Sequence, residues 1–200
     1  MSPAASTSPR SDGRAALDAL AVRLLEAVPE LRVAVATTAA ERDAIAGLRH
    51  RQVTGHAGGL EQDAYDAAAL QIGAWDAAGA LVGGMRLVLP EPGRLLPVEA
   101  AFGLRIDPPG AAAEAGRLVI APERRGDPAH RAWGALFART WLELRAGGLV
   151  VLAGAASPRM VERLRGVGLP FEVLAPARPY WGEPRHPVRL DPARAAPRWF

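Results

Sequence analysis

The sequence predicts an α/β protein with one mixed β-sheet and helices on both of its faces. Its second half alternates strand-like and helix-like segments, which is typical of βαβ units. Its first half contains two β-rich segments, residues 69–75 and 81–89, joined by the short turn 76–79, which indicates an antiparallel hairpin. Residues 149–153 are apolar without interruption, as expected for a central strand buried on both faces.

Two amphipathic segments in the first half predict helices. In residues 15–28, leucine and valine recur every three or four positions, so that one face is apolar. The second helix begins after Thr38, because Thr38 and Glu41 have the spacing of a capping box, and it extends to about residue 53. The alternating, β-branched residues 31–36 between these helices predict a strand.

The most informative stretch is a predicted strand over residues 115–121, followed by a basic turn and a helix over residues 128–145. Such a turn presents free backbone N–H groups and a helix N-terminus that can hold a phosphate. A plain strand–helix connection with solvated arginines is the alternative. The remaining elements are expected as an irregular segment at 90–109, a helix at 158–165, and closing strands at 171–174 and 188–190.

Length and composition indicate one domain with a complete core. The 200 residues, half of them apolar, suit a single domain over residues 15–200 after a disordered tail of residues 1–14, which has no apolar signal-peptide core. No apolar run approaches the roughly 20 residues that cross a bilayer. The chain has no cysteine, which excludes disulfides and thiolate sites and fits a cytoplasmic protein.

Charge and histidine usage exclude two classes of function. All 24 basic residues are arginines, the net charge is only +3, and no basic tract interleaves with aromatic residues, so we expect no nucleic-acid partner. The four histidines are scattered without the spacing of metal ligands, so we expect no metal site. The tryptophans at four positions are expected in the core: Trp75, Trp133, Trp141 and Trp181.

The order of elements, with the strand–turn–helix in its middle, resembles the GNAT acyltransferase fold. The segment Ile120-x-Pro122-x-x-Arg125-Gly126 is similar to the start of the coenzyme-binding motif of these enzymes. The chain then departs from their usual glycine pattern. This departure favours a carrier-bound acyl donor over acetyl-CoA.

Shorter motifs resemble one branch of that fold, the acyl-homoserine-lactone synthases and N-acyl amino acid synthases. Together they cover about residues 31–191 and occur in the expected order. They are Arg49-x-Arg51-x-Val53, Asp63-x-Tyr65-Asp66, Arg86 after two glycines, Glu114-x-x-Arg117 and Gly182-x-x-Arg185-x-Pro187.

The resemblance implies transfer of an acyl group from a phosphopantetheine thioester, carried by acyl carrier protein or coenzyme A, to the amine of an amino acid or similar small molecule. The pantetheine would lie between strands 115–121 and 149–153, which splay apart in these families. The residues implied in holding the pantetheine and its phosphate are Leu118, Val119, Ile120, Arg124, Arg125, Gly126 and Arg131. Acyl carrier protein, being acidic, would prefer this basic face.

The resemblance also implies the reacting groups. Glu114 would accept the amine proton, and Arg117 and Arg86 would hold acidic side chains or a substrate carboxylate. The implied substrate-binding residues are Asp63, Asp66, Arg51 and Phe102. A purely structural ion-pair network at the pocket floor is the alternative.

Glu114 and Arg117 present a geometric difficulty. Residues three apart on a regular strand face opposite sides of the sheet. Both can reach one pocket only if an extra residue bulges, and Gly116 is placed for such a bulge.

Two other functions stay open at this point. One is an ordinary GNAT acetyltransferase that uses acetyl-CoA, and the other is a non-catalytic GNAT-like binding module. Deep apolar space behind Phe102, Leu104 and Val151 would favour long acyl chains over acetyl groups. The acyl length, the acceptor, the carrier and the oligomeric state are not predicted by the sequence.

Overall fold

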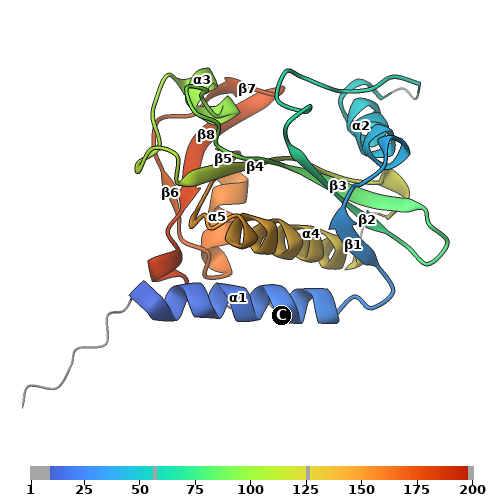
Figure 1. Cartoon of the computed structure of the whole chain (residues 1–200), viewed down its shortest axis with the longest axis horizontal. Coiled ribbons are helices and arrows are strands. Elements are labelled where there is room, and N and C mark those ends of the chain that lie inside the picture. Colours follow the sequence, from blue (N-terminus) through green and yellow to red (C-terminus); the bar gives the residue numbers. More distant parts are fainter. Residues whose placement is uncertain (1–9, 56–57, 125–126, 198–200) are drawn as a thin grey trace, which may run out of the picture.

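A computed structural model describes residues 10–55, 58–124 and 127–197 of the chain (Figure 1). The helices are α1 (Arg10–Glu26), α2 (Ala39–Thr54), α3 (Pro97–Phe102), α4 (Asp127–Ala146) and α5 (Pro158–Gly166), with 3-10 turns η1 (Pro122–Arg124) and η2 (Pro192–Arg194). The strands are β1 (Arg32–Val35), β2 (Leu70–Trp75), β3 (Leu81–Val88), β4 (Ala112–Ile120), β5 (Val151–Ala156), β6 (Phe171–Val173), β7 (Arg178–Tyr180) and β8 (Glu183–Leu190).

The strands form the predicted mixed sheet. Their order across it is β1-β2-β3-β4-β5-β8-β6, and β7 pairs with β8 as a hairpin. The β2–β3 hairpin is antiparallel, whereas β4 and β5 run parallel, with α4 as the crossover between them. The mixed α/β fold class predicted from the sequence is therefore confirmed.

The parallel pair β4–β5 separates part-way along its length. Its register contains only Ala112↔Val151, Ala113↔Leu152 and Glu114↔Ala153, although both strands continue beyond these residues. A Cβ on Gly154 would lie 2.7 Å from the carbonyl oxygen of Ala115, so glycine is needed where the two backbones diverge. The C-terminal part of β4 consequently keeps β3 as its strand partner and has one free edge.

Helices cover both faces of the sheet (Figure 1). The amphipathic helices α1, α4 and α5 lie on one face, where Leu17, Leu136, Trp141 and Leu164 belong to the main apolar core. On the opposite face lie α2 and α3, and this face carries the charged side chains of β3 and β4. No helix in the described ranges has the length and apolar character that crossing a membrane requires.

Three elements differ from the sequence prediction. Helix α1 begins at Arg10, so residues 10–14 are helical and were wrongly placed in the tail; residues 1–9 lie outside the described part of the chain. Helix α3 forms inside the segment that was expected to be irregular, because Pro97 fits the first helical turn and Glu99 accepts the N–H of Leu96. Strand β7 forms between the two closing strands predicted at 171–174 and 188–190, where no element was predicted.

Candidate active site

A cavity of about 700 Å³ opens where β4 and β5 separate. Its walls come from β4, β5, the β7–β8 hairpin and the helices on both sides of the sheet. One end is polar and includes Arg49, Glu61, Glu114 and Arg117. The other end is apolar and is lined by Trp133, Phe137, Met160, Leu164 and Phe171, which lie on α4, α5 and β6.

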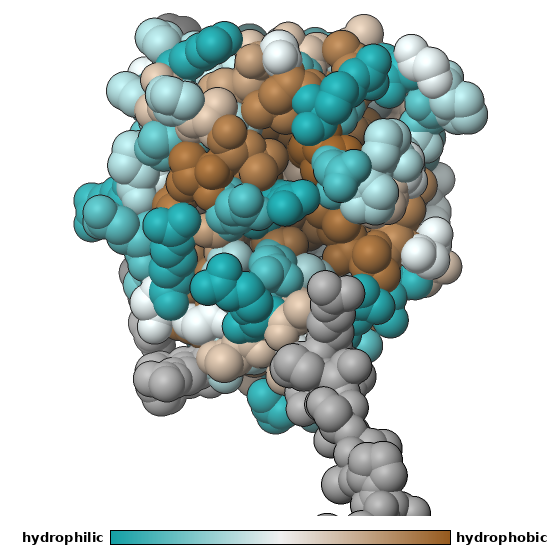
Figure 2. All heavy atoms as spheres, turned by 90° about the vertical axis from the view of Figure 1, so that its left-hand side faces the viewer, coloured by the Kyte–Doolittle hydropathy of each residue, from teal (hydrophilic) through white to brown (hydrophobic). Residues whose placement is uncertain are grey.

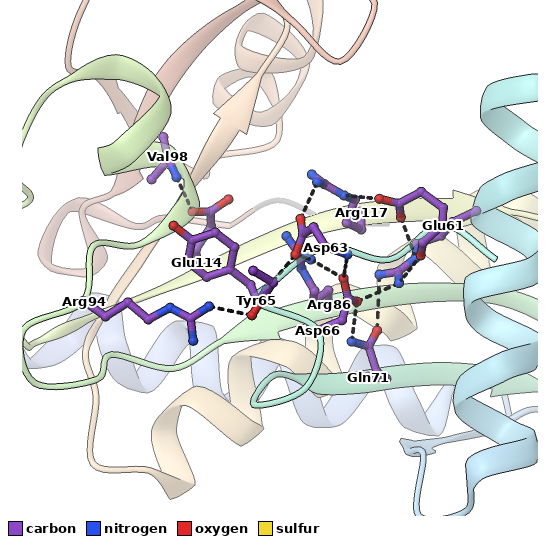
Figure 3. Close-up of polar contacts among 12 residues, drawn as sticks. Glu61, Asp63, Tyr65, Asp66, Gln71, Arg86, Arg94, Val98, Glu114 and Arg117 are labelled. Atoms are coloured by element: carbon purple, nitrogen blue, oxygen red, sulfur yellow. Dashed lines mark hydrogen bonds and ion pairs between the residues drawn. The ribbon is translucent and has the colours of Figure 1, made fainter.

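Three arginines and three carboxylates at the polar end form a closed ring of alternating charge, five of which Figure 3 labels: Glu61, Asp63, Asp66, Arg86 and Arg117. Six contacts of 2.7–3.3 Å join them in the order Arg49, Glu61, Arg117, Asp63, Arg86, Asp66 and back to Arg49. We call these six residues the ion-pair ring. Its formal charge is zero, and each guanidinium faces two carboxylates.

The ring is largely buried, and its charged side chains pair with one another. Arg49 and Arg86 have side chains 2% and 1% exposed, whereas Asp63 is 30% exposed and is the most accessible member. Burial acts to raise the pKa of Asp66, but the N–H of Asp63 and the charges of Arg49 and Arg86 outweigh it and lower that pKa. Burial acts to lower the pKa of Arg86, and its bond to Asp63 and the charge of Asp66 raise it instead.

A β-bulge brings Arg117 into this ring. Between the pairs Gly84↔Val119 and Arg86↔Gly116, β4 has one residue more than β3. Arg117 is in the bulge and has a φ of 56°, in the left-handed region that non-glycine residues seldom adopt. The predicted bulge is therefore confirmed, but it lies at Arg117 and Leu118, directly after Gly116.

Glu114 lies beside the ring, and its side chain is almost fully buried. The residue is 3% exposed, and its Oε2 accepts the backbone N–H of Val98 at 2.6 Å. Burial raises the pKa of Glu114 to about 7; the Val98 N–H and the charges of Arg86 and Arg117 oppose the rise only in part. Its Oε1 faces the space that a side chain at position 116 would enter, 3.7 Å from an ideal Cβ there. Gly116 thus leaves room beside the carboxylate.

Two members of the ion-pair ring, Arg49 and Glu61, were not among the predicted site residues, and the predicted residue Arg51 does not belong to the ring. Arg51 is exposed on α2 and does not line the cavity; Arg49, two residues earlier, takes the place expected for it. Arg49 follows Ile45 by four residues and so shares the buried face of α2, which is the signal that would have identified it. Glu61 lies two residues before Asp63. In an extended chain, residues two apart direct their side chains to the same side, which is the signal that would have identified Glu61.

The apolar space is not where it was expected. Phe102 is buried in a cluster with Val98 and Ile106 and contacts Tyr180 edge to face at 5.7 Å, and Leu104 and Val151 pack against that cluster. Figure 2, which views the side where α3, β6 and β8 lie, shows apolar patches separated by hydrophilic side chains. The apolar end of the cavity lies on the other face of the sheet, between α4 and α5. Phe102 does not line the cavity itself.

The predicted donor-binding residues lie in several different places. Leu118 and Val119 line the cavity on the free edge of β4, and Ile120 packs against the main core. Arg124 pairs with Asp76 in the β2–β3 turn. Arg125 and Gly126 lie outside the described residues.

Arg131 does not reach the cavity. It donates to the carbonyl of Ala27 and lies 3.1 Å from Glu30, so it ties α4 to the segment that follows α1. Its predicted role in holding a phosphate is not supported by its position.

The tryptophans were expected in the core, and two of them are. Trp75 and Trp141 are buried, whereas Trp133 and Trp181 line the cavity. Trp181 is 36% exposed, and its ring lies 3.4 Å from the guanidinium carbon of Arg117.

Comparisons with known proteins agree with this geometry. Residues 46–133 match the family model of the GNAT acetyltransferase domain. The acyl-homoserine-lactone synthase LasI superposes with a TM-score of 0.61 at 17% identity, covering 80% of this chain and 89% of its own. FeeM, an N-acyl amino acid synthase from uncultured soil microbes, gives 0.59 at 14%, covering 80% and 89%.

An acyl-CoA N-acyltransferase from Pseudomonas aeruginosa gives a TM-score of 0.58 at 17% identity and covers 80% of this chain and 97% of its own. The chain has the GNAT acyltransferase fold. The resemblance to the GNAT fold stated from the sequence is therefore confirmed, and the solved structures of similar fold include an acyl-homoserine-lactone synthase and an N-acyl amino acid synthase. No curated protein matches the sequence significantly.

Proposed function

We propose that the protein is an N-acyltransferase that moves an acyl group from a phosphopantetheine thioester to the amine of an amino acid or similar small molecule. The observation that carries this proposal is the opening between β4 and β5 immediately after the buried carboxylate of Glu114. The GNAT fold supports it, as do solved neighbours that are named as acyltransferases and acyl-amine synthases.

The opening suits the donor. Val119 is opposite Gly84 and directs its backbone groups to β3, so the backbone groups of Leu118 and Ile120 face the free edge of β4 and are available to pair with the two amides of a pantetheine arm, as an added strand would. The apolar end of the cavity between α4 and α5 then accepts the acyl chain. An apolar lining of this extent favours chains longer than acetyl, because each buried methylene contributes about 0.8 kcal/mol.

The polar end suits the acceptor. The amine nitrogen attacks the thioester carbon, the C–N bond forms, the C–S bond breaks and the thiol leaves. Glu114 takes the proton that the nitrogen loses. A pKa of about 7 allows Glu114 to act as a general base near neutral pH. Of the ring carboxylates, Glu61 lines the cavity and Asp63 is the most exposed; they attract the cationic form of the amine, and Arg117 pairs with both of them.

Acetyl transfer from acetyl-CoA is the second candidate, and the match to an acetyltransferase domain model favours it. The non-catalytic alternative has less support, because Glu114 and Arg117 both line the cavity that the separated strands create. An active enzyme needs this arrangement, and a binding module does not.

The test uses purified protein and separate incubations with acetyl-CoA, palmitoyl-CoA and palmitoyl-acyl carrier protein. Each incubation contains an equimolar mixture of amino acids. Free thiol is measured together with N-acyl products by mass spectrometry. We expect amine-dependent thiol release and N-acyl amino acids, with palmitoyl donors preferred; products from acetyl-CoA alone would support the second candidate.

Glu114→Gln keeps the size of the side chain and an acceptor for the Val98 N–H but removes the base, so product formation should fall by about 10²–10⁴-fold. Glu99→Gln is a buried control, because Glu99 caps α3 and does not line the cavity. Glu162→Gln on the exposed face of α5 is a surface control. Lipid extracts of cells expressing wild type or Glu114→Ala extend the search to other amines. No N-acyl product from any donor or extract would contradict the proposal.

A further inference from the structure

The two non-glycine residues with positive φ in the described part of the chain touch each other. They are Arg117 and Trp181, both with a φ of 56°. Arg117 is in the bulge of β4, and Trp181 is in the tip of the β7–β8 hairpin, far from Arg117 in the sequence. The guanidinium carbon of Arg117 lies 3.4 Å from the Trp181 ring, which is a close cation–π contact.

The hairpin tip is an unfavourable place for tryptophan. Tyr180 pairs with Glu183, so Trp181 and Gly182 form a two-residue turn, and both have positive φ. Turns of this kind favour asparagine, aspartate or glycine at the first position, because a large side chain is strained there. A strained non-glycine residue that lines a cavity points to a function for its side chain.

Trp181 completes the surroundings of Arg117. Two sides of the guanidinium are held by Glu61 and Asp63, at 3.3 and 2.8 Å, and the Trp181 ring stacks on it. The Arg117 side chain is only 9% exposed, whereas Trp181 remains 36% exposed. The ring of Trp181 thus shields Arg117 from solvent at the polar end of the cavity.

We propose that Trp181 is a positioning residue for the acyl-transfer site: it stacks on Arg117, holds that side chain in the ion-pair ring, and forms the wall of the acceptor end of the cavity. This inference rests on the proposed acyltransferase function. It predicts that the contact affects the acceptor and not the donor, because Arg117 and Trp181 lie at the polar end and the acyl chain occupies the apolar end.

The key variant is Trp181→Asn. Asparagine tolerates positive φ, so the hairpin should fold at least as stably as in wild type while the stacking is lost. We expect acceptor KM to rise, and acceptor kcat/KM to fall roughly 3- to 30-fold, which is the range of a partly buried cation–π contact. Donor KM should stay unchanged. Trp181→Phe keeps an aromatic face and should restore most of the rate.

A double-mutant cycle with Arg117→Asn tests whether Trp181 acts through Arg117. In the Arg117→Asn background, Trp181→Asn should have no further effect. Additive effects, an altered donor KM, or full activity in Trp181→Asn would overturn the proposal.

A measurement without substrate separates this inference from the proposed function. In 15N–1H spectra of the arginine side chains, ring currents of Trp181 should shift the Nε–H signal of Arg117, and Trp181→Asn should remove that shift. If the wild type forms no N-acyl product but the shift is present, the acyltransferase proposal has failed and the contact stands. If product forms and the shift is absent, the positioning role has failed.

Discussion

The two ends of the cavity are held together by different interactions, ion pairs at one end and apolar packing at the other. At the polar end, six charged side chains lie beside Glu114 on the face of the sheet that carries α2 and α3, and they pair with one another. At the apolar end, residues such as Phe137 and Leu164 continue the main core between α4 and α5. Both ends meet where β4 and β5 separate.

The difference indicates that the two ends have different functions. Buried charge stabilises a fold poorly, because removing ions from water costs about as much as their attraction returns. A ring of six such charges is therefore better explained by a need to hold groups in place than by a need for stability. The apolar end requires only space and an apolar lining, and its volume limits the length of the acyl chain that it accepts.

Breaking the ion-pair ring should have the largest effect on stability. Arg86→Met removes the arginine that pairs with both Asp63 and Asp66. Leaving largely buried carboxylates without this partner typically costs about 3–5 kcal/mol. We expect the free energy of unfolding, measured in urea, to fall by this amount. The matched control is Arg189→Met, which removes an exposed pair with Glu172 at 2.7 Å and should cost no more than about 1 kcal/mol. Equal losses in the two variants would show that the ring does not behave as a buried network.

The raised pKa of Glu114 predicts that the free energy of unfolding depends on pH, with a change somewhat smaller than that expected for Arg86→Met. Its value of about 7 in the folded protein compares with 4.5 ordinarily, so between these pH values the folded protein keeps a proton that the unfolded chain has lost. The free energy of unfolding should therefore fall as pH rises from about 4.5 to 7, by about 3 kcal/mol in total. Asp66, whose pKa is lowered from 3.8, affects stability only at more acidic pH.

Activity should change in the opposite direction, since Glu114 accepts a proton only when ionised. The rate should rise with pH up to about 7 and then level. Urea unfolding of wild type and Glu114→Gln at several pH values isolates the contribution, because the variant cannot titrate at this position. Parallel stability curves for the two proteins would refute the assignment of the raised pKa to Glu114.

The polar end was easier to predict than its surroundings. Asp63, Asp66, Arg86, Glu114 and Arg117 could be identified because a resemblance fixed their spacing, and the bulge followed from strand periodicity. Their pairing into a ring could not be predicted, since it depends on how the segment before β2 folds over β3 and β4.

Residues outside the motifs were less predictable. Trp181 reaches Arg117 only through a left-handed hairpin turn, which no local pattern indicates. Arg131 was assigned to a phosphate because it follows a basic turn, but its partner Glu30 comes from a distant loop. Sequence spacing predicts which face of an element a residue occupies, and tertiary packing decides which neighbour that face meets.

Narrowing the apolar end should have the smallest effect and should change only the donor. Met160 on α5 is partly buried and lines the cavity, so Met160→Trp fills space that a long acyl chain would use. Loss of room for about two methylenes lowers the preference for palmitoyl-CoA over octanoyl-CoA roughly 10-fold, at about 0.8 kcal/mol each. Competition between the two donors, with products resolved by mass spectrometry, measures this ratio. Glu162→Gln on the same helix should leave it unchanged. A changed acceptor profile in Met160→Trp would mean that the two ends are coupled and that the division between them is incomplete.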